Sequence, residues 1–316
     1  MTALVSTRQE RPLFFPAGEH TLFGILTQPA TNPKGIAVVI LPGGTNLSMN
    51  VNGLSVRFCR RVARHGFHAL RFDYHGVGES SGRPDRVDLA SPFVSDLDGA
   101  LASLRAHGIE RFVLVGSCFG ARTVLAGTPT TDGLVGVVLI SPPVRDFEMG
   151  ELEVTRMAAE LSVGDFARRA VSARALSGLL KADRRRTYYK LVREKLRERR
   201  GRSSERAADR QARYAISPRF LEPLRDLVSR GSPVLFIYGD GDDLWGEFQR
   251  GRATSPLAEV LGTATISSTT LPGRVHGFSD SRVADGVFDF VADWIVELPA
   301  VDGMQPAGQG RNEGIP

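Results

Sequence analysis

The chain has 316 residues, of which 42% are hydrophobic and 24% are charged, and its net charge is +5. It is therefore long enough and apolar enough to bury a full core, while no apolar run reaches the roughly 18 residues of a membrane span. The first residues lack the apolar core of a signal peptide, and two cysteines, Cys59 and Cys118, argue against a disulfide framework. These features predict a soluble, cytoplasmic enzyme.

Strand and helix patterns alternate along the chain, which is typical of a mostly parallel sheet covered by helices. The expected strands are residues 22–28, 36–41, 68–74, 111–116, 134–141, 233–239 and 264–271. The expected helices are residues 51–65, 92–107, 119–127 and 279–297. We therefore expect an α/β core made of residues 1–143 and 232–298, and we predict that the Gly- and Pro-rich tail 299–316 is disordered.

The loop after the expected strand 36–41 carries Gly43, Gly44 and Thr45. Glycines let a backbone approach a ligand closely. Backbone N–H groups of this loop, together with that of Phe119, are candidates for an oxyanion hole in an acyl-transfer reaction.

The pentapeptide 116–120, Gly-Ser-Cys-Phe-Gly, lies between the expected strand 111–116 and the expected helix 119–127. A strand, a sharp turn and a helix are the context of a nucleophile elbow, whose central residue is usually serine. Here the central residue is Cys118, which predicts a thiol nucleophile and a thioester intermediate. Such a pattern also occurs by chance, so its weight comes from the elements that follow it.

Between residues 144 and 231 the strand signal disappears, and helix formers and arginines dominate. We interpret this range as a helical cap inserted after the expected strand 134–141. That strand corresponds to strand 6 in the standard numbering of an α/β-hydrolase sheet. Residues 151–230 carry 21 Lys and Arg and 11 Asp and Glu, so the basic charge is concentrated there. Its densest part begins with Arg184, Arg185 and Arg186.

This charge has two interpretations. One is a solvated helix face; the other is a surface that attracts an acidic acyl carrier protein, which delivers its acyl group as a thioester. No nucleic-acid motif accompanies the charge, and residues 184–202 are too polar for a membrane-surface helix. Four aromatic residues either line an acyl pocket under the cap or serve only packing: Phe166, Tyr188, Tyr189 and Trp245.

The last two strands supply candidates for an acid and a base. Asp242 follows the expected strand 233–239 and is the expected acid, with Asp240 and Asp243 as alternatives. His276 follows the expected strand 264–271 and is the expected base. The chain order of nucleophile, acid and histidine is the order of the α/β-hydrolase triad.

One further segment carries a family resemblance. Residues 70–80, Leu-Arg-Phe-Asp-Tyr-His-Gly-Val-Gly-Glu-Ser, resemble the Asp-x-Arg-Gly-x-Gly-x-Ser signature of serine aminopeptidase-like α/β-hydrolases, with His75 in place of the usual Arg. With the Gly43-Gly44 loop and the cysteine elbow, the chain is similar to exosortase-associated hydrolases and to hydrolase-like enzymes of polyketide pathways. The resemblance covers residues 20–145 and 230–298. It implies an acyl or ester substrate and neither a metal nor an organic cofactor.

The sequence thus predicts a Cys118-His276-Asp242 enzyme that cleaves or transfers an acyl group from an ester or thioester. In this hypothesis His276 lowers the pKa of Cys118 and takes its proton, helped by the positive end of the helix dipole. Two alternatives stay open. One is a lyase in which His276 abstracts a proton and an acyloxy group leaves, such as acetate from an acetylated tetronate; the other is a non-catalytic binding module.

Overall fold

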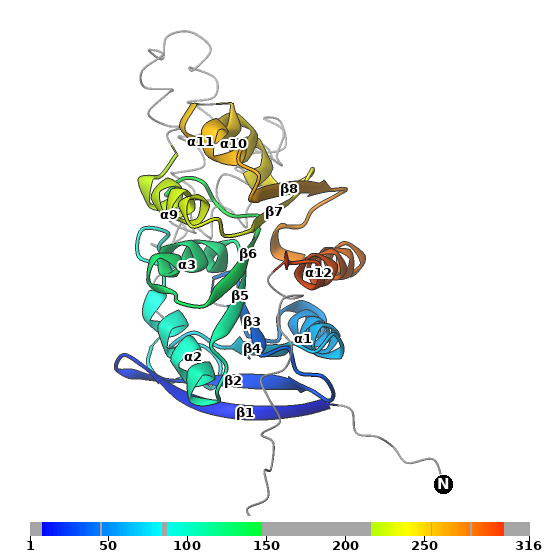
Figure 1. The fold of residues 1–316 in the computed structure, drawn as a ribbon. Helices are drawn as coiled ribbons and strands as arrows, with labels where there is room; N and C mark the ends of the chain where they lie inside the picture. The colour runs from blue at the N-terminus through cyan, green and yellow to red at the C-terminus, as the bar shows by residue number, and fades with distance from the viewer. Residues whose placement is uncertain are drawn as a thin grey trace, which may run out of the picture.

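The computed structural model describes residues 8–44, 46–83, 87–146, 216–253, 255–278 and 280–299. Within these residues eight strands form one sheet, in the order β1-β2-β4-β3-β5-β6-β7-β8 (Figure 1). The strands are β1 (Arg8–Ala17), β2 (His20–Pro29), β3 (Ile36–Leu41), β4 (His68–Phe72), β5 (Arg111–Ser117), β6 (Leu134–Ile140), β7 (Val234–Gly239) and β8 (Ile266–Leu271).

Six neighbouring strands, from β4 to β8 in the sheet order, pair in parallel, whereas β1 and β2 form an antiparallel hairpin that pairs antiparallel with β4. Every residue of β3 and β7 is buried, because helices cover these strands on both faces. Their continuous apolar sequences follow from that burial. The mostly parallel α/β sheet predicted from the sequence is therefore confirmed.

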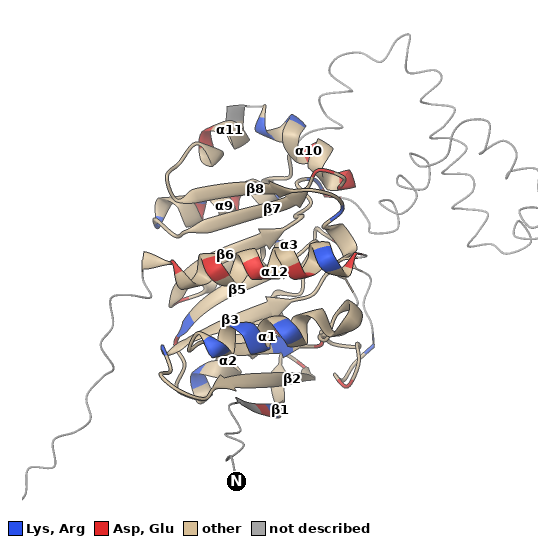
Figure 2. Ribbon diagram, turned by 90° about the vertical axis from the view of Figure 1, so that its right-hand side faces the viewer, with Lys and Arg blue, Asp and Glu red and all other residues tan. Residues whose placement is uncertain are grey.

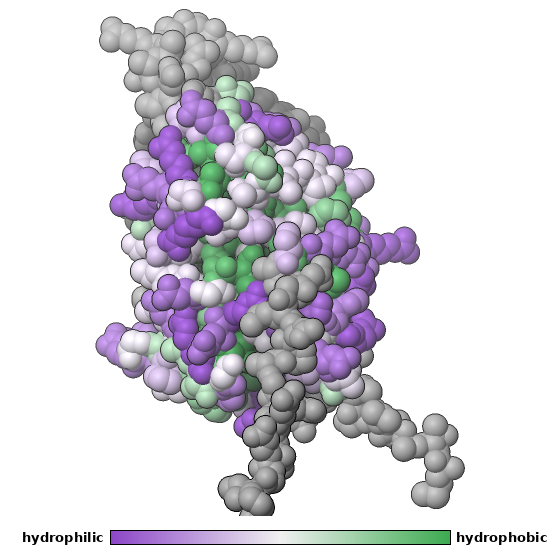
Figure 3. Space-filling model, in the orientation of Figure 1, coloured by the Kyte–Doolittle hydropathy of each residue, from purple (hydrophilic) through white to green (hydrophobic). Residues whose placement is uncertain are grey.

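Helices lie on both faces of the sheet (Figure 1). One face is covered by α1 (Leu54–Arg64) and α12 (Ser281–Val296), and the other by α2 (Val94–Ala106), α3 (Phe119–Gly127), α9 (Pro218–Ser229), α10 (Asp243–Arg252) and α11 (Ser255–Leu261). Each face has its own hydrophobic cluster, since alternate residues of each strand point to opposite sides. Figure 3 shows hydrophobic side chains in the middle of this view, where the sheet lies, between hydrophilic flanks.

The helices α1 and α12 lie side by side and carry opposite charge. Figure 2 shows basic residues along α1 and acidic residues along α12. Arg57 donates to Asp285 at 2.7 Å, and Arg61 pairs with Asp289. These pairs are solvent-exposed, so each contributes at most about 1 kcal/mol and the apolar contact beneath them holds the two helices.

Two parts of the fold differ from the sequence prediction. Strand β1 was not expected because Pro12 and Pro16 interrupt its pattern, yet both prolines are tolerated at the edge of a sheet. Helix α9 falls within the range 144–231 predicted as a cap, but its buried residues Phe220 and Leu224 belong to the same hydrophobic cluster as α3. The second core segment therefore begins by residue 216 rather than 232. Residues 147–215 of the predicted cap and residues 300–316 of the predicted tail lie outside the described residues.

The order of the strands determines where a ligand site is expected. From β3 the chain moves to β4 on one side, and then crosses to β5 on the other side of β3. In such sheets ligands bind at the carboxyl ends of the strands where the direction of winding reverses. The loops after β3 and β5, which hold Gly43 and Cys118, meet at this point.

Candidate active site

The turn between β5 and α3 holds Cys118 in a backbone conformation that side chains rarely adopt. Its φ is 49° and its ψ is −112°. The Cys118 N–H donates to the carbonyl of Ile140 at 2.9 Å, which fixes the turn to the end of β6. Such strain is typical of a functional turn whose neighbours hold one side chain in place. The geometry is that of the nucleophile elbow predicted from the sequence.

The two glycines of the elbow are required by close backbone contacts. A Cβ placed on Gly116 would lie 2.5 Å from the carbonyl oxygen of Gly120. A Cβ placed on Gly120 would lie 2.6 Å from the carbonyl oxygen of Pro42 and would also collide with that of Leu41. Both distances are too short for any side chain, so glycine at each position lets α3 pack directly on β5 and on the end of β3.

A small cavity of about 90 Å3 opens beside Cys118. It is lined by residues from the ends of β3, β5, β6 and β8, namely Gly43, Asn46, Ser117, Cys118, Ile140, Ser141, Val275, His276, Gly277 and Phe278. Its apolar walls, Ile140, Val275 and Phe278, belong to the cluster on the α12 face of the sheet. The structure thus brings Cys118 and His276, separated by 158 positions in the sequence, to one cavity.

Asp242 lies directly after β7 and is buried. Its Oδ2 accepts from the Ser141 hydroxyl at 2.6 Å and the Gly239 N–H at 2.8 Å. Its Oδ1 accepts from the N–H groups of Val275 at 2.9 Å and His276 at 2.7 Å. The carboxylate therefore holds the segment that carries His276 against the end of β7.

The two alternative acids face a neighbouring part of the same turn. Asp240 accepts from the Gly273 N–H at 2.7 Å, and Asp243 lies 3.7 Å from the guanidinium of Arg274. Neither contact reaches the backbone of His276. Among the three aspartates, Asp242 is the one whose hydrogen bonds join the acid loop to His276.

The loop after β3 lies against the elbow. A Cβ on Gly43 would contact that of Cys118 at 3.4 Å, so this part of the loop passes next to the Cys118 side chain. The loop is fixed through the Ser48 N–H, which donates to the Asp73 carboxylate at 2.6 Å. Gly44 has a φ of 58°, and Thr45 lies outside the described residues. Gly43 and the Phe119 N–H are therefore the oxyanion candidates for which the structure gives a contact with Cys118.

Burial dominates the acidity of the candidate nucleophile. It raises the pKa of the Cys118 thiol from 9.0 to about 12; the Phe119 N–H beside the sulphur lowers the pKa, and the Asp242 charge raises it. The expectation that Cys118 has a lowered pKa is therefore wrong. Burial penalises the charged thiolate, and this desolvation outweighs the hydrogen bond from the Phe119 N–H.

This result predicts how alkylation of Cys118 depends on pH. Because the thiolate reacts and the pKa is about 12, the rate of iodoacetamide labelling should rise about tenfold per pH unit from pH 7 to 9. Cys59 should remain unlabelled in the folded protein, since it is fully buried and its pKa is also raised to about 12. Peptide mass spectrometry after timed labelling gives both rates. A plateau in the Cys118 rate below pH 8 would contradict this account.

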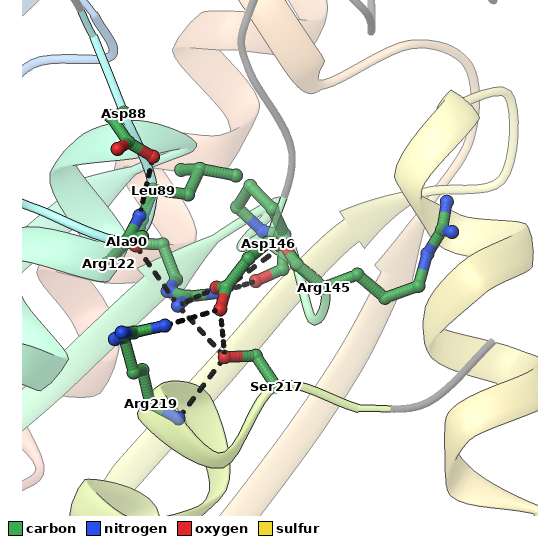
Figure 4. Close-up of polar contacts among 9 residues, drawn as sticks. Asp88, Leu89, Ala90, Arg122, Arg145, Asp146, Ser217 and Arg219 are labelled. Carbon is green, nitrogen blue, oxygen red and sulfur yellow. Dashed lines mark hydrogen bonds and ion pairs between the residues drawn. The ribbon is translucent and has the colours of Figure 1, made fainter. Parts of the chain in front are cut away.

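A buried arginine in the first turn of the elbow helix anchors that helix to two neighbouring loops (Figure 4). Arg122, one turn after Cys118, is 1% exposed and donates to the carbonyls of Leu89 and Pro143 at 3.2 Å each and to Asp146 Oδ1 at 2.6 Å. The Ser217 hydroxyl donates to the other oxygen of Asp146 at 2.8 Å. Arg122 thus ties Asp146 and Ser217 to the helix that follows Cys118.

None of the remaining predicted site residues is found among the described residues that line the cavity. Trp245 packs against Tyr238 and Phe248, with ring centroids 5.5 and 5.9 Å apart, and is not among the residues that line the cavity. The reason is that α10 covers the sheet face opposite to that of Phe278. Phe166, Tyr188, Tyr189, Arg184, Arg185 and Arg186 lie outside the described residues.

The sequence reasoning also missed several cavity residues. Asn46, Ser141 and Phe278 line the cavity, but none belongs to a recognisable motif. Their only sequence signal is their position just after a strand or beside a predicted site residue. In the part of the chain that the structure describes, no group of three or more His, Cys, Asp or Glu side chains is placed to hold a metal ion. No helix in that part is long and apolar enough to cross a membrane.

Solved structures with similar folds come from several sources. A proline iminopeptidase from Mycobacterium smegmatis is 18% identical, with a TM-score of 0.56, over 90% of this chain and 97% of that one. The esterase Pf2001 from Pyrococcus furiosus is 15% identical, with a TM-score of 0.57, over 91% of this chain and 92% of that one. The protein VinJ is 18% identical, with a TM-score of 0.56, over 92% of this chain and 99% of that one. At these identities the likeness concerns the fold.

No curated protein matches the sequence. The family model described as the alpha/beta hydrolase family matches residues 38–290, a range that includes the elbow, the acid loop and His276. Because this match spans most of the sequence, the chain belongs to the alpha/beta hydrolase family and has the α/β-hydrolase fold.

Proposed function

We propose that this protein is a cysteine-dependent acyl hydrolase or acyltransferase that acts on an ester or thioester with a short acyl group. The observation that carries the proposal is the common cavity of Cys118 and His276, next to a strained elbow and an anchored carboxylate. Two of the structural neighbours are named as an esterase and as a proline iminopeptidase, and these names are consistent with this reaction class.

The proposed mechanism follows from a thiol that is neutral before substrate binds. Because burial raises the pKa of Cys118 to about 12, the thiol is protonated at pH 7. His276 therefore takes the proton as the sulphur attacks the carbonyl carbon, and the Phe119 N–H and the loop at Gly43 stabilise the developing oxyanion. The leaving alcohol or thiol takes the proton from His276, and the acyl group stays on Cys118 as a thioester. Water or another nucleophile then releases it.

A second candidate reaction is that of a lyase. A protonated thiol is compatible with it, because the lyase reaction needs no thiolate. In that reaction His276 removes a proton from the carbon next to the one that bears the acyloxy group. The electrons of the C–H bond form a C=C bond, and the acyloxy group leaves as a carboxylate with the electrons of its C–O bond. Cys118 then forms part of the cavity wall and makes no bond to the substrate. The resemblance to hydrolase-like enzymes of polyketide pathways is consistent with either reaction.

The size of the cavity predicts a preference for short acyl groups. Its volume of about 90 Å3 is well below the roughly 150 Å3 of a cavity that holds benzene. We expect kcat/KM to fall about tenfold or more between acetyl and hexanoyl thioesters. Steady-state rates for a series of chain lengths give this ratio. A flat or rising series would contradict the proposed acyl site.

A pair of variants ties that preference to the cavity wall. Phe278→Ala should shift the optimum towards longer chains, because the Phe278 ring lines the cavity. Phe288→Ala is the matched control: its ring lies 5.4 Å from that of Phe278 but is not among the residues that line the cavity. Both variants lose a buried phenyl ring, so a change in chain-length preference that occurs in Phe278→Ala and not in Phe288→Ala is assigned to the cavity wall.

We also propose that the protein acts in the cytoplasm and that an acidic acyl carrier protein delivers its substrate. The carrier proposal rests on residues 151–230, which carry a net charge of +10. Exposed charges are screened over roughly 8 Å at physiological salt, so this association should weaken steeply as salt is added. Changing Arg184, Arg185 and Arg186 together to Glu should raise KM for a carrier-bound thioester and leave kcat for a small free thioester unchanged. If both substrates respond alike, or neither responds, no carrier binds through these residues.

A further inference from the structure

Ser141, the first residue after β6, combines three features that point to a role at the site. It is 1% exposed, it lines the cavity beside Cys118, and its φ is 45°. Its N–H donates to the carbonyl of Ile237 at 2.7 Å, which fixes its backbone between β6 and β7. A side chain in this left-handed region is strained, and glycine would adopt the conformation without that cost. The hydroxyl is what serine supplies here and glycine does not.

That hydroxyl is used by the candidate acid. It donates to Asp242 Oδ2 at 2.6 Å, a short distance typical of a hydrogen bond to a charged oxygen. Three backbone N–H groups, of Gly239, Val275 and His276, also donate to this carboxylate. Ser141 is the donor that comes from β6, the strand whose last carbonyl also holds the Cys118 N–H. Two consecutive residues, Ile140 and Ser141, therefore contact the nucleophile and the acid.

We propose that Ser141 is a positioning residue that fixes the rotation of the Asp242 carboxylate and, through it, the backbone of His276. With Oδ2 held by Ser141 and Gly239, Oδ1 stays directed at the N–H groups of residues 275 and 276. The inference rests on the proposed function of Asp242 and His276, but it applies equally to acyl transfer and to the lyase reaction, because both use His276 as the base.

Two substitutions of Ser141 distinguish an effect on the position of Asp242 from an effect on the stability of the protein. Ser141→Gly removes the hydroxyl and also the backbone strain, so the melting temperature should stay close to that of the wild type. Its kcat should fall about tenfold to a hundredfold, as for other groups that orient a site residue, with little change in KM. Ser141→Thr keeps the hydroxyl but adds a branch at a strained position, so the melting temperature should fall while kcat stays near the wild-type value.

Asn32→Gly is the matched control, because Asn32 is exposed, has a φ of 49° and lies outside the candidate site. It should leave kcat unchanged. Full kcat in Ser141→Gly, or a fall in kcat that follows the melting temperature in both Ser141 variants, would overturn the proposal. His276→Ala, measured in the same assay, distinguishes this failure from failure of the proposed function: if His276→Ala keeps full activity, the reaction itself has been assigned wrongly.

Discussion

Cys118→Ala should lower kcat/KM for a short acyl thioester by about 10⁴-fold or more. The loss of a nucleophile that forms the covalent intermediate leaves only the oxyanion donors and substrate binding to accelerate the reaction. The variant should fold, because a methyl group occupies less space than the thiol at a position that borders a cavity. The measurement is kcat/KM together with the melting temperature of each protein.

His276→Ala is the companion variant that separates the two candidate reactions. In acyl transfer both variants should be almost inactive, and the double variant should be hardly slower than either one, because the two residues act in the same step. In the lyase reaction His276→Ala should be inactive while Cys118→Ala keeps most of its activity. Full activity in both variants would exclude both mechanisms, whereas a wild-type protein without activity on either kind of substrate would favour a binding module.

Asp242→Asn should lower both activity and stability. The amide places an NH2 group where one carboxylate oxygen now accepts two hydrogen bonds, either from Ser141 and Gly239 or from Val275 and His276. A buried donor left without an acceptor costs about 1–3 kcal/mol, so we expect the free energy of unfolding to fall by about 3 kcal/mol. The loss of the carboxylate that orients the base should lower kcat by about 10³-fold.

Asp240→Asn is the control for that variant, since Asp240 lies in the same turn but accepts from Gly273 at an exposed position. It should change stability by less than about 1 kcal/mol and leave kcat nearly unchanged. Denaturant unfolding and steady-state kinetics on both proteins provide the comparison. Equal effects of the two substitutions would show that the turn, and not the Asp242 carboxylate, determines the activity.

The sequence predicted most of the sheet because the information is local. β3 and β7 are short, fully apolar strands, and the elbow glycines are dictated by contacts within the strand–turn–helix unit. β1 was missed because its stability comes from pairing with β2 at an edge where prolines are allowed. α9 was assigned to the cap because nothing in its own residues distinguishes packing on α3 from packing elsewhere.

The site was predicted less completely, for a related reason. The order of Cys118, Asp242 and His276 is visible in the chain, but the cavity is formed by residues that meet only in three dimensions, such as Asn46, Ser141 and Phe278. The raised pKa of Cys118 depends on how deeply the thiol is buried, and no local sequence pattern reports that. The fold therefore follows from the sequence more fully than the chemistry does.

Intact-protein mass spectrometry after rapid acid quenching tests the central claim most directly. Mixed with an acetyl thioester, the wild-type protein should gain the mass of one acetyl group within a turnover, and peptide mapping should place it on Cys118. His276→Ala should form this species much more slowly, and Cys118→Ala should not form it. Turnover by the wild-type protein with no such species at any quench time, or an acetyl group on Ser117 instead of Cys118, would contradict the account.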